Sequence, residues 1–192
     1  MNISRDEAAS ALAEIDQARG RIIQLQGYHH GAQFFIIWGL VWLIANIGTY
    51  LFPAAETTIW PASLAIGALS SISHGIRTSL RGRQKALQSP ATRREWRQAI
   101  MTSLVVMAFI TCLVMIADPA STRQLNAMIS IVFPFLYMAG GIWVGWRLFV
   151  IGLVTAIGIM AGYVWIPEHF ELWMGLFGGG SLIAGGVWLR KA

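Results

Sequence analysis

The chain has 192 residues, of which 56% are hydrophobic and only 12% are charged. That is too little charge to cover the surface of a soluble domain of this size, so the composition indicates an integral membrane protein. The net charge of +5 would suggest a nucleic-acid partner in a soluble protein. The position of the basic residues between apolar segments explains this charge better, and no nucleic-acid partner is expected.

Residues 4–27 predict an amphipathic helix on the cytoplasmic side of the membrane. Ser4 and Glu7 match a capping box, in which each side chain satisfies a free N–H group of the first helical turn. An apolar seam follows at alternating spacings of three and four, formed by Ala8, Ala11, Ile15, Ala18, Ile22 and Leu25. This seam can lie on the membrane surface, pack under the chain's own bundle, or form a coiled coil with another chain. We expect this unit, residues 1–31, to end in a bend between Gly27 and Gly31.

Residues 32–192 contain apolar runs that predict a transmembrane domain. Each run is near the ~20 residues that a helix needs to cross the hydrocarbon core. The six runs cover 33–52, 57–76, 99–117, 125–145, 148–166 and 170–189. Short turns that contain proline pair them in sequence. The predicted fold is therefore an all-α integral membrane protein, with six transmembrane helices as three hairpins plus the N-terminal cytoplasmic amphipathic helix.

A basic loop, residues 77–98, orients this topology. It holds seven of the 14 basic residues: Arg77, Arg81, Arg83, Lys85, Arg93, Arg94 and Arg97. Such clusters stay on the cytoplasmic side during insertion. All basic residues except Arg123 then lie on that side, which predicts a multi-pass protein of a bacterial inner (plasma) membrane with both termini in the cytoplasm. The loop can contact anionic lipid head groups or a cytoplasmic protein partner.

The first and last predicted hairpins share a short pattern. Gly-Leu-Val at residues 39–41 recurs at 152–154, and the same offset aligns Trp60 with Trp173. This favours three hairpins derived from one ancestral unit, an internal repeat with a common membrane orientation. Coincidence between apolar segments is the alternative, because glycine, leucine and valine are frequent in all of them.

Glycines four residues apart suggest where these helices approach one another closely. The pairs are Gly141 and Gly145, Gly158 and Gly162, and Gly175 and Gly179, while Gly185 belongs to a second face of the last span. Small residues let helix backbones approach where lipid provides no hydrophobic drive between helices. Such faces serve either packing within the chain or a homodimer through the last span.

The sequence shows no catalytic motif. No acidic or basic residue lies in the middle of a predicted span, although ion-coupled transporters usually need one. A phosphate-binding loop, a zinc-protease helix and a nucleophile elbow are all missing from the sequence. We therefore expect no catalytic residues, and the chain is not expected to be an enzyme.

Histidines form the strongest candidate for a cofactor or metal site. His29 and His30 begin the first predicted span, and His74 lies at the same depth near the end of the second. His30 and His74 could bind haem iron from facing helices, and the three histidines together could bind a metal ion. The alternative is that they lie unliganded at the wet membrane interface.

Polar residues inside the first two spans offer a second possibility. Asn46 lies in the first span, and Ser70, Ser71 and Ser73 lie in the second. They can hydrogen-bond between helices. Alternatively, they can line a polar cavity for a small neutral solute.

The Trp-Gly-Leu-Val-Trp motif at residues 38–42 and the glycine-rich ending at 178–190 resemble an uncharacterised group of small bacterial inner-membrane proteins. An acidic-then-basic N-terminal helix adds to the resemblance. It implies a six-span membrane protein, and because no activity is known for the group it implies no functional residues.

Three functions follow from these patterns. The first is a non-enzymatic interaction, regulatory or structural protein that acts through its cytoplasmic helix and basic loop. The second is a channel or carrier for a small neutral or hydrophobic solute. The third is a membrane redox protein that binds haem or a metal through His30 and His74.

Overall fold

The computed structural model describes residues 5–83 and 90–191, and within these ranges the chain is helical without strands. Side chains at 5–10, 79–83, 90–96 and 99, and at several positions up to His30, are outside the description. The long helices are α1 (Arg5–Leu51), α2 (Glu56–Arg83), α3 (Pro90–Ala117), α4 (Thr122–Val144) and α5 (Trp146–Trp165). A composite segment follows, made of η2 (Pro167–His169), α6 (Phe170–Trp173), the π-helical η3 (Met174–Gly179) and α7 (Gly180–Arg190). The short helix η1 (Pro53–Ala55) joins α1 to α2.

Several of these helices are long and apolar enough to cross a membrane. The described residues contain five such stretches: Gly27–Leu51, Ile100–Ala117, Thr122–Val144, Trp146–Trp165 and Pro167–Arg190. The prediction of an all-helical chain with several helices long and apolar enough to span a membrane is therefore confirmed. Helix α2 has the length of a span but is not among the five, because serines, Pro61 and His74 lower its mean hydropathy.

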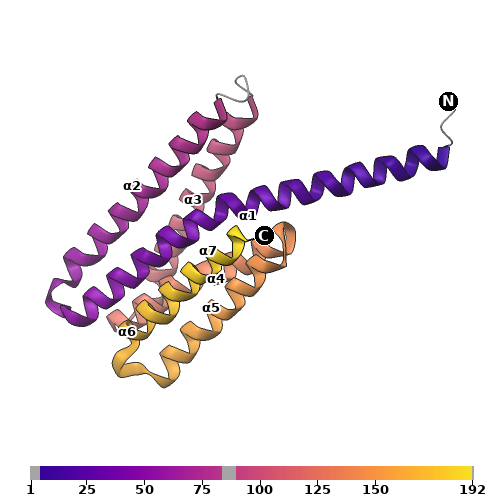
Figure 1. Cartoon of the computed structure of the whole chain (residues 1–192). Coiled ribbons are helices and arrows are strands. Elements are labelled where there is room, and N and C mark those ends of the chain that lie inside the picture. The colour runs from indigo at the N-terminus through magenta and orange to yellow at the C-terminus, as the bar shows by residue number, and fades with distance from the viewer. Residues whose placement is uncertain (1–4, 84–89, 192) are drawn as a thin grey trace.

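Helix α1 is central to the packing. It lies along α7 and η3 on one side and along α2 on the other, while α4 and α5 form a second closely packed pair (Figure 1). The closest pairings, α1 with α7 and α4 with α5, thus join helices that the sequence had assigned to different hairpins. Buried side chains from α1, α5, α6, η3 and α7 form the core, which includes Tyr28, Trp42, Ile159, Phe170 and Leu182.

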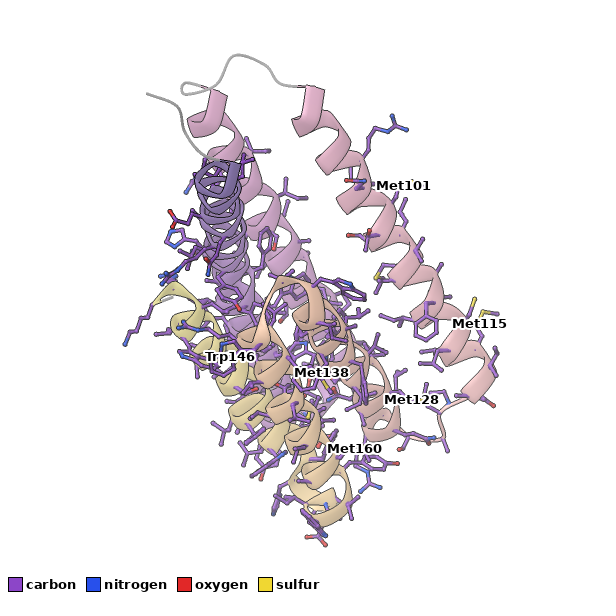
Figure 2. The ribbon with its side chains drawn as sticks, turned by 90° about the vertical axis from the view of Figure 1, so that its right-hand side faces the viewer. Met101, Met115, Met128, Met138, Trp146 and Met160 are labelled. Atoms are coloured by element: carbon purple, nitrogen blue, oxygen red, sulfur yellow. The ribbon has the colours of Figure 1, made fainter. Side chains whose placement is uncertain are left out.

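Helix α3 stands apart from the other helices. Its main contact is with α4, and Met101 and Met115 are exposed on its surface (Figure 2). Within its apolar stretch, Ile100–Ala117, Ile110 is the buried side chain. In a membrane, lipid tails can cover such a helix as well as protein does, because they are as apolar as its side chains.

The two ends of the bundle differ in charge. Both termini, the end of α2, the start of α3 and the turn between α4 and α5 lie at one end, which we call the basic end (Figure 1). The turns at 52–55, 118–121 and 166–169 lie at the other. This second end carries Glu56, Asp118, Glu168 and Glu171, and we call it the acidic end.

The bend predicted between Gly27 and Gly31 does not interrupt α1. The helix runs for 47 residues through both glycines, so the predicted boundary at residue 31 falls inside it. Glycine in a helix interior costs only about 1 kcal/mol relative to alanine, which packing can offset. Tyr28 and Ala32 are buried here, and Ala32 lies against Gly186 of α7.

Replacing Gly31 with alanine is expected to stabilise the protein by up to about 1 kcal/mol, because alanine favours the helix and loses less backbone entropy. A Cβ at this position would meet no atom within 4 Å. Denaturant unfolding of the detergent-solubilised protein, followed by circular dichroism, measures the change. Gly27→Ala, whose Cβ would make an ordinary 3.5 Å contact with Val144, should shift stability in the same direction. A loss of stability in both variants would show that this segment requires a glycine bend.

The boundary between α4 and α5 is a single residue. Gly145 has φ 146°, and α5 begins immediately after it at Trp146. A residue with a side chain rarely adopts this conformation, so glycine allows the chain to reverse without a longer loop. Gly145 was predicted to lie on a helix-packing face, and the structure corrects this: it forms the turn.

Candidate functional site

The N-terminal part of α1 extends beyond the helical bundle. A helix of 47 residues is about 70 Å long, whereas the stretch Gly27–Leu51 already suffices to cross a membrane. Residues 5–26 therefore continue outward at the basic end, and we call them the projecting segment (Figure 1). Its described side chains are all exposed, namely Ala11, Leu12, Glu14, Ile15, Gln17, Ala18, Arg21 and Leu25.

The predicted apolar seam lies on this exposed segment. Ile15 is 60% exposed, and Ala11, Ala18 and Leu25 are exposed with it. The alternative in which the seam packs under the chain's own bundle is wrong for these four positions. Ala8 and Ile22 belong to the same seam, but their side chains are outside the description. An apolar stripe of this kind on an isolated helix is typical of a surface that another helix covers.

The basic loop lies at the same end as the projecting segment. Arg77 on α2 and Arg97 on α3 are exposed. The backbones of Arg81, Arg83, Arg93 and Arg94 are helical, while their side chains, and all of Lys85, lie outside the described residues. Contact of this loop with anionic lipid or with a partner stays a prediction.

Contacts at the basic end hold the C-terminus against α1 and α5. Arg147 Nη1 donates to the Trp188 carbonyl oxygen at 3.2 Å, and its guanidinium group lies 5.3 Å from the centre of the Trp188 ring. Arg190 Nη2 donates to Gln33 Oε1 of α1. These bonds fix the point at which α1 leaves the bundle, and hence where the projecting segment begins.

The histidines do not form a ligand pair in the described part of the chain. His74 is half-buried on α2, and its ring packs edge-on against Phe34 of α1, with ring centroids 5.8 Å apart. His29 is exposed, and the His30 side chain is outside the description. No group of three described His, Cys, Asp or Glu side chains is placed to bind a metal ion. Among the described side chains of α1, Phe34 contacts the His74 ring, and a phenylalanine cannot act as a haem or metal ligand; the predicted pairing of His74 with His30 involves a side chain outside the description.

A buried polar network joins α1 to α4 inside the bundle. Asn126 Nδ2 donates to Asn46 Oδ1 at 2.7 Å, and Ser130 Oγ donates to Asn126 Oδ1 at 3.1 Å. Asn46 Nδ2 donates to the Trp42 carbonyl oxygen at 2.9 Å. All three side chains are buried. In a low-dielectric interior such bonds specify which helices pair and in which register.

This network differs from the one expected between Asn46 and the serines of α2. Ser73 instead donates to the Ser70 carbonyl oxygen of its own helix, and the buried Ser71 hydroxyl has no hydrogen-bond partner among the described residues. Asn126 and Ser130 were not among the polar residues predicted to bond between helices. Their spacing of four within an apolar span was the signal that could have found them, because it places both on one helical face.

Glycines bring α1 and η3 into direct backbone contact. A Cβ on Gly179 would lie 2.7 Å from the Gly39 carbonyl oxygen, and one on Gly39 would lie 2.8 Å from the Gly179 carbonyl oxygen. Gly175 lies against the Ile47 side chain and the Leu43 carbonyl oxygen of α1. Gly39 was not among the predicted packing residues, since its glycine partner lies on another helix.

The remaining predicted glycines also pack within the chain. Gly158 and Gly162 of α5 lie under the stacked rings of Phe177 and Trp173, and Trp173 Nε1 donates to the Gly158 carbonyl oxygen at 2.8 Å. Further contacts are those of Gly185 with Ile151 and of Gly141 with the backbone of Phe149. The chain itself therefore covers the glycine faces on which a homodimer through the last span was predicted to rest.

Comparison with known proteins adds no family to this description. Family models, curated proteins and solved structures each contain no match to this chain.

Proposed function

We propose that this chain is a non-enzymatic, multi-pass protein of a bacterial inner membrane that binds a helical protein partner through its projecting segment. The observation that carries the proposal is the exposed apolar seam on a helix that extends beyond the bundle. Exposing a continuous apolar stripe to water is unfavourable, so a covering partner lowers the free energy of the segment.

The charge difference between the two ends of the bundle supports a cytoplasmic location for this segment. Arg5, Arg19 and Arg21 lie in it, and the basic loop lies at the same end. Clusters of arginine and lysine are retained in the cytoplasm during membrane insertion. Both termini and the projecting segment therefore belong to the cytoplasmic side in this proposal.

The continuity of α1 favours a protein partner over the membrane surface. A segment that lies on the membrane must turn sharply away from the direction of its transmembrane helix. Such a turn needs a break in the helix, whereas α1 passes through Gly27 and Gly31 without one. The projecting segment accordingly points away from the membrane and offers its seam to another helix.

The seam residues favour a second copy of this chain as the partner. In heptad notation Ile15 and Ile22 occupy position a and Leu25 occupies position d, a combination that favours two parallel strands. The same register places Glu14 at position g and Arg19 at position e of the next heptad. In a parallel dimer these two charges face each other across the interface, once on each side.

Replacing Ile15 with aspartate is expected to weaken self-association at least tenfold, because the dimer would bury an unpaired charge. Gln17→Asp is the matched control, since it adds the same charge on the opposite face of the same helix. Light scattering of the detergent-solubilised protein over a concentration series measures the monomer–dimer equilibrium. The I15D variant should be monomeric at concentrations where the Q17D variant and the unchanged chain are dimeric.

Disulfide crosslinking in native membranes tests the same contact. In a Cys112→Ser background, Ala18→Cys on the seam should form an oxidised dimer, whereas Gln17→Cys should not. Equal crosslinking at both positions, or equal mass of I15D and Q17D, would contradict the proposal. Loss of a different co-purifying protein from I15D alone would replace the second copy with a separate partner.

The other two predicted functions receive less support from the described residues. A channel for a neutral solute needs polar side chains that are available to the solute, but Asn46, Asn126 and Ser130 hydrogen-bond one another. A haem site needs a second ligand beside His74, and the described side chain of α1 that contacts its ring is Phe34.

A further inference from the structure

A cavity of about 340 Å³ lies at the acidic end of the bundle. Side chains from distant parts of the sequence line it: Thr49 and Tyr50 of α1, Glu56 of α2, Thr122 of α4, Glu168 of η2 and Glu171 of α6. Small-molecule sites typically have volumes of about 300–1,000 Å³. The cavity lies at the opposite end from the projecting segment, so it has no part in the function proposed above.

Three carboxylates around this cavity have no cationic partner among the described residues. The carboxylate groups of Glu56, Glu168 and Glu171 form no ion pair or hydrogen bond with any residue that the structure describes. The basic groups nearby in the fold have other contacts. The Arg123 guanidinium lies 5.1 Å from the centre of the Tyr163 ring, and His169 Nδ1 is hydrogen-bonded to Tyr50 Oη at 3.3 Å. Three like charges around one volume attract a cation into it.

A buried hydroxyl provides an independent sign of a ligand. Thr49 lines the cavity and is only 6% exposed, yet its Oγ1 has no hydrogen-bond partner among the described residues. Buried polar groups are nearly always hydrogen-bonded, since an unpaired one is costly. Asn46, one turn away on α1, is already bonded to Asn126 and Trp42. A bound donor in the cavity would satisfy the Thr49 hydroxyl.

The chemistry of the lining favours an organic cation over a metal ion. No three described carboxylate, histidine or cysteine side chains are close enough to share one metal ion. The glutamates are spread around a volume that suits a larger ligand. The Tyr50 ring at the cavity is suited to contact an ammonium group, and a threonine oxygen accepts a hydrogen bond from N–H.

We propose that this cavity binds an alkylammonium ligand. Glu56, Glu168 and Glu171 neutralise its positive charge, and Thr49 Oγ1 accepts a hydrogen bond from it. The ligand is either a free polyamine or the ammonium group of an ethanolamine lipid, since both present the same chemistry at a membrane surface.

Titration calorimetry with spermidine on the protein in choline-lipid nanodiscs tests the free-amine source. Thermal stabilisation by ethanolamine lipid, relative to choline lipid, tests the lipid source. Glu171→Gln and Glu56→Gln should each lower the affinity for spermidine about tenfold or more, because each removes one full charge from the site. If ethanolamine lipid is the ligand, each variant should lose the thermal stabilisation that this lipid provides. Raised salt should weaken spermidine binding to the unchanged protein.

Asp118→Asn is the matched control. It removes one negative charge at the same end of the bundle without altering the cavity lining, and asparagine tolerates the φ of 41° at this position. Its affinity should equal that of the unchanged protein. The proposal is overturned if neither probe binds, if D118N loses as much affinity as E171Q, or if Mg²⁺ alone saturates the site and excludes spermidine.

Thr49→Val separates a ligand contact from a structural role. Without ligand this variant should be as stable as the unchanged protein or more so, because it removes an unpaired buried hydroxyl. Its affinity for the ligand that binds should fall about fivefold or more. A variant that is less stable without ligand, or that keeps full affinity, would show that Thr49 is not a ligand contact.

Discussion

Replacing Gly179 with alanine is expected to destabilise the protein by about 2–3 kcal/mol, because the added methyl group would overpack a contact between two helices. The added Cβ would lie 2.7 Å from the Gly39 carbonyl oxygen and 2.8 Å from the Leu43 backbone nitrogen. Both are backbone atoms of α1, so they cannot move aside as the end of a side chain can. The two helices must separate, and the contacts along α1, η3 and α7 are lost together.

Gly180→Ala is the control for this prediction. Gly180 is the next residue in the chain, and a Cβ on it would meet no atom within 4 Å. Unfolding in sodium dodecyl sulfate, followed by tryptophan fluorescence, measures both variants against the unchanged protein. G180A should match or slightly exceed its stability, as helix propensity dictates. Equal stability of G179A and G180A would show that α1 and η3 do not approach each other in this way.

Replacing Asn126 with leucine is expected to cost about 1–2 kcal/mol. It leaves Asn46 Oδ1 without the donor that lies 2.7 Å away, and it also removes the acceptor of the Ser130 hydroxyl. These groups are buried, so neither water nor lipid can replace the lost bonds. Asn46→Leu should destabilise the protein by a similar amount, because it leaves Asn126 Nδ2 unpaired.

The double variant distinguishes this network from two independent packing losses. If Asn46 and Asn126 bond each other, replacing both with leucine should cost clearly less than the sum of the single changes. The same detergent unfolding assay supplies all values of the cycle. Ser73→Ala serves as the control, because Ser73 is exposed and bonds only within its own helix. Strict additivity of the two asparagine variants would contradict the network.

The helix ends were largely predictable from local residues. The first predicted span ended at 52 and α1 ends at Leu51, while the last was predicted at 170–189 and α7 ends at Arg190. Pro53 follows the end of α1 closely, and Pro167 follows the end of α5 at Trp165, because proline cannot continue a helix that needs its N–H group. Local chemistry also predicted that the chain is helical and suited to a membrane, since apolar length alone decides this.

The bend at Gly27–Gly31 was the local prediction that failed. Two glycines lower helix propensity, yet α7 packs against this segment of α1 through Gly186 and Ala32. A contact with a residue more than 150 positions away cannot be read from the sequence around the glycines. The same holds for Gly145, whose role in a turn rather than on a packing face depends on where α5 lies.

The sequence by itself therefore determined the helical class, the positions of most helix ends and the segregation of charge that distinguishes the two ends of the bundle. Only the tertiary structure decided that Asn46 bonds Asn126, that Gly39 meets Gly179, that α3 stands apart, and that three glutamates line one cavity. The physical reason lies in the membrane as a solvent. Lipid tails are as apolar as leucine, so hydrophobicity marks a residue as embedded without revealing whether it faces lipid or another helix.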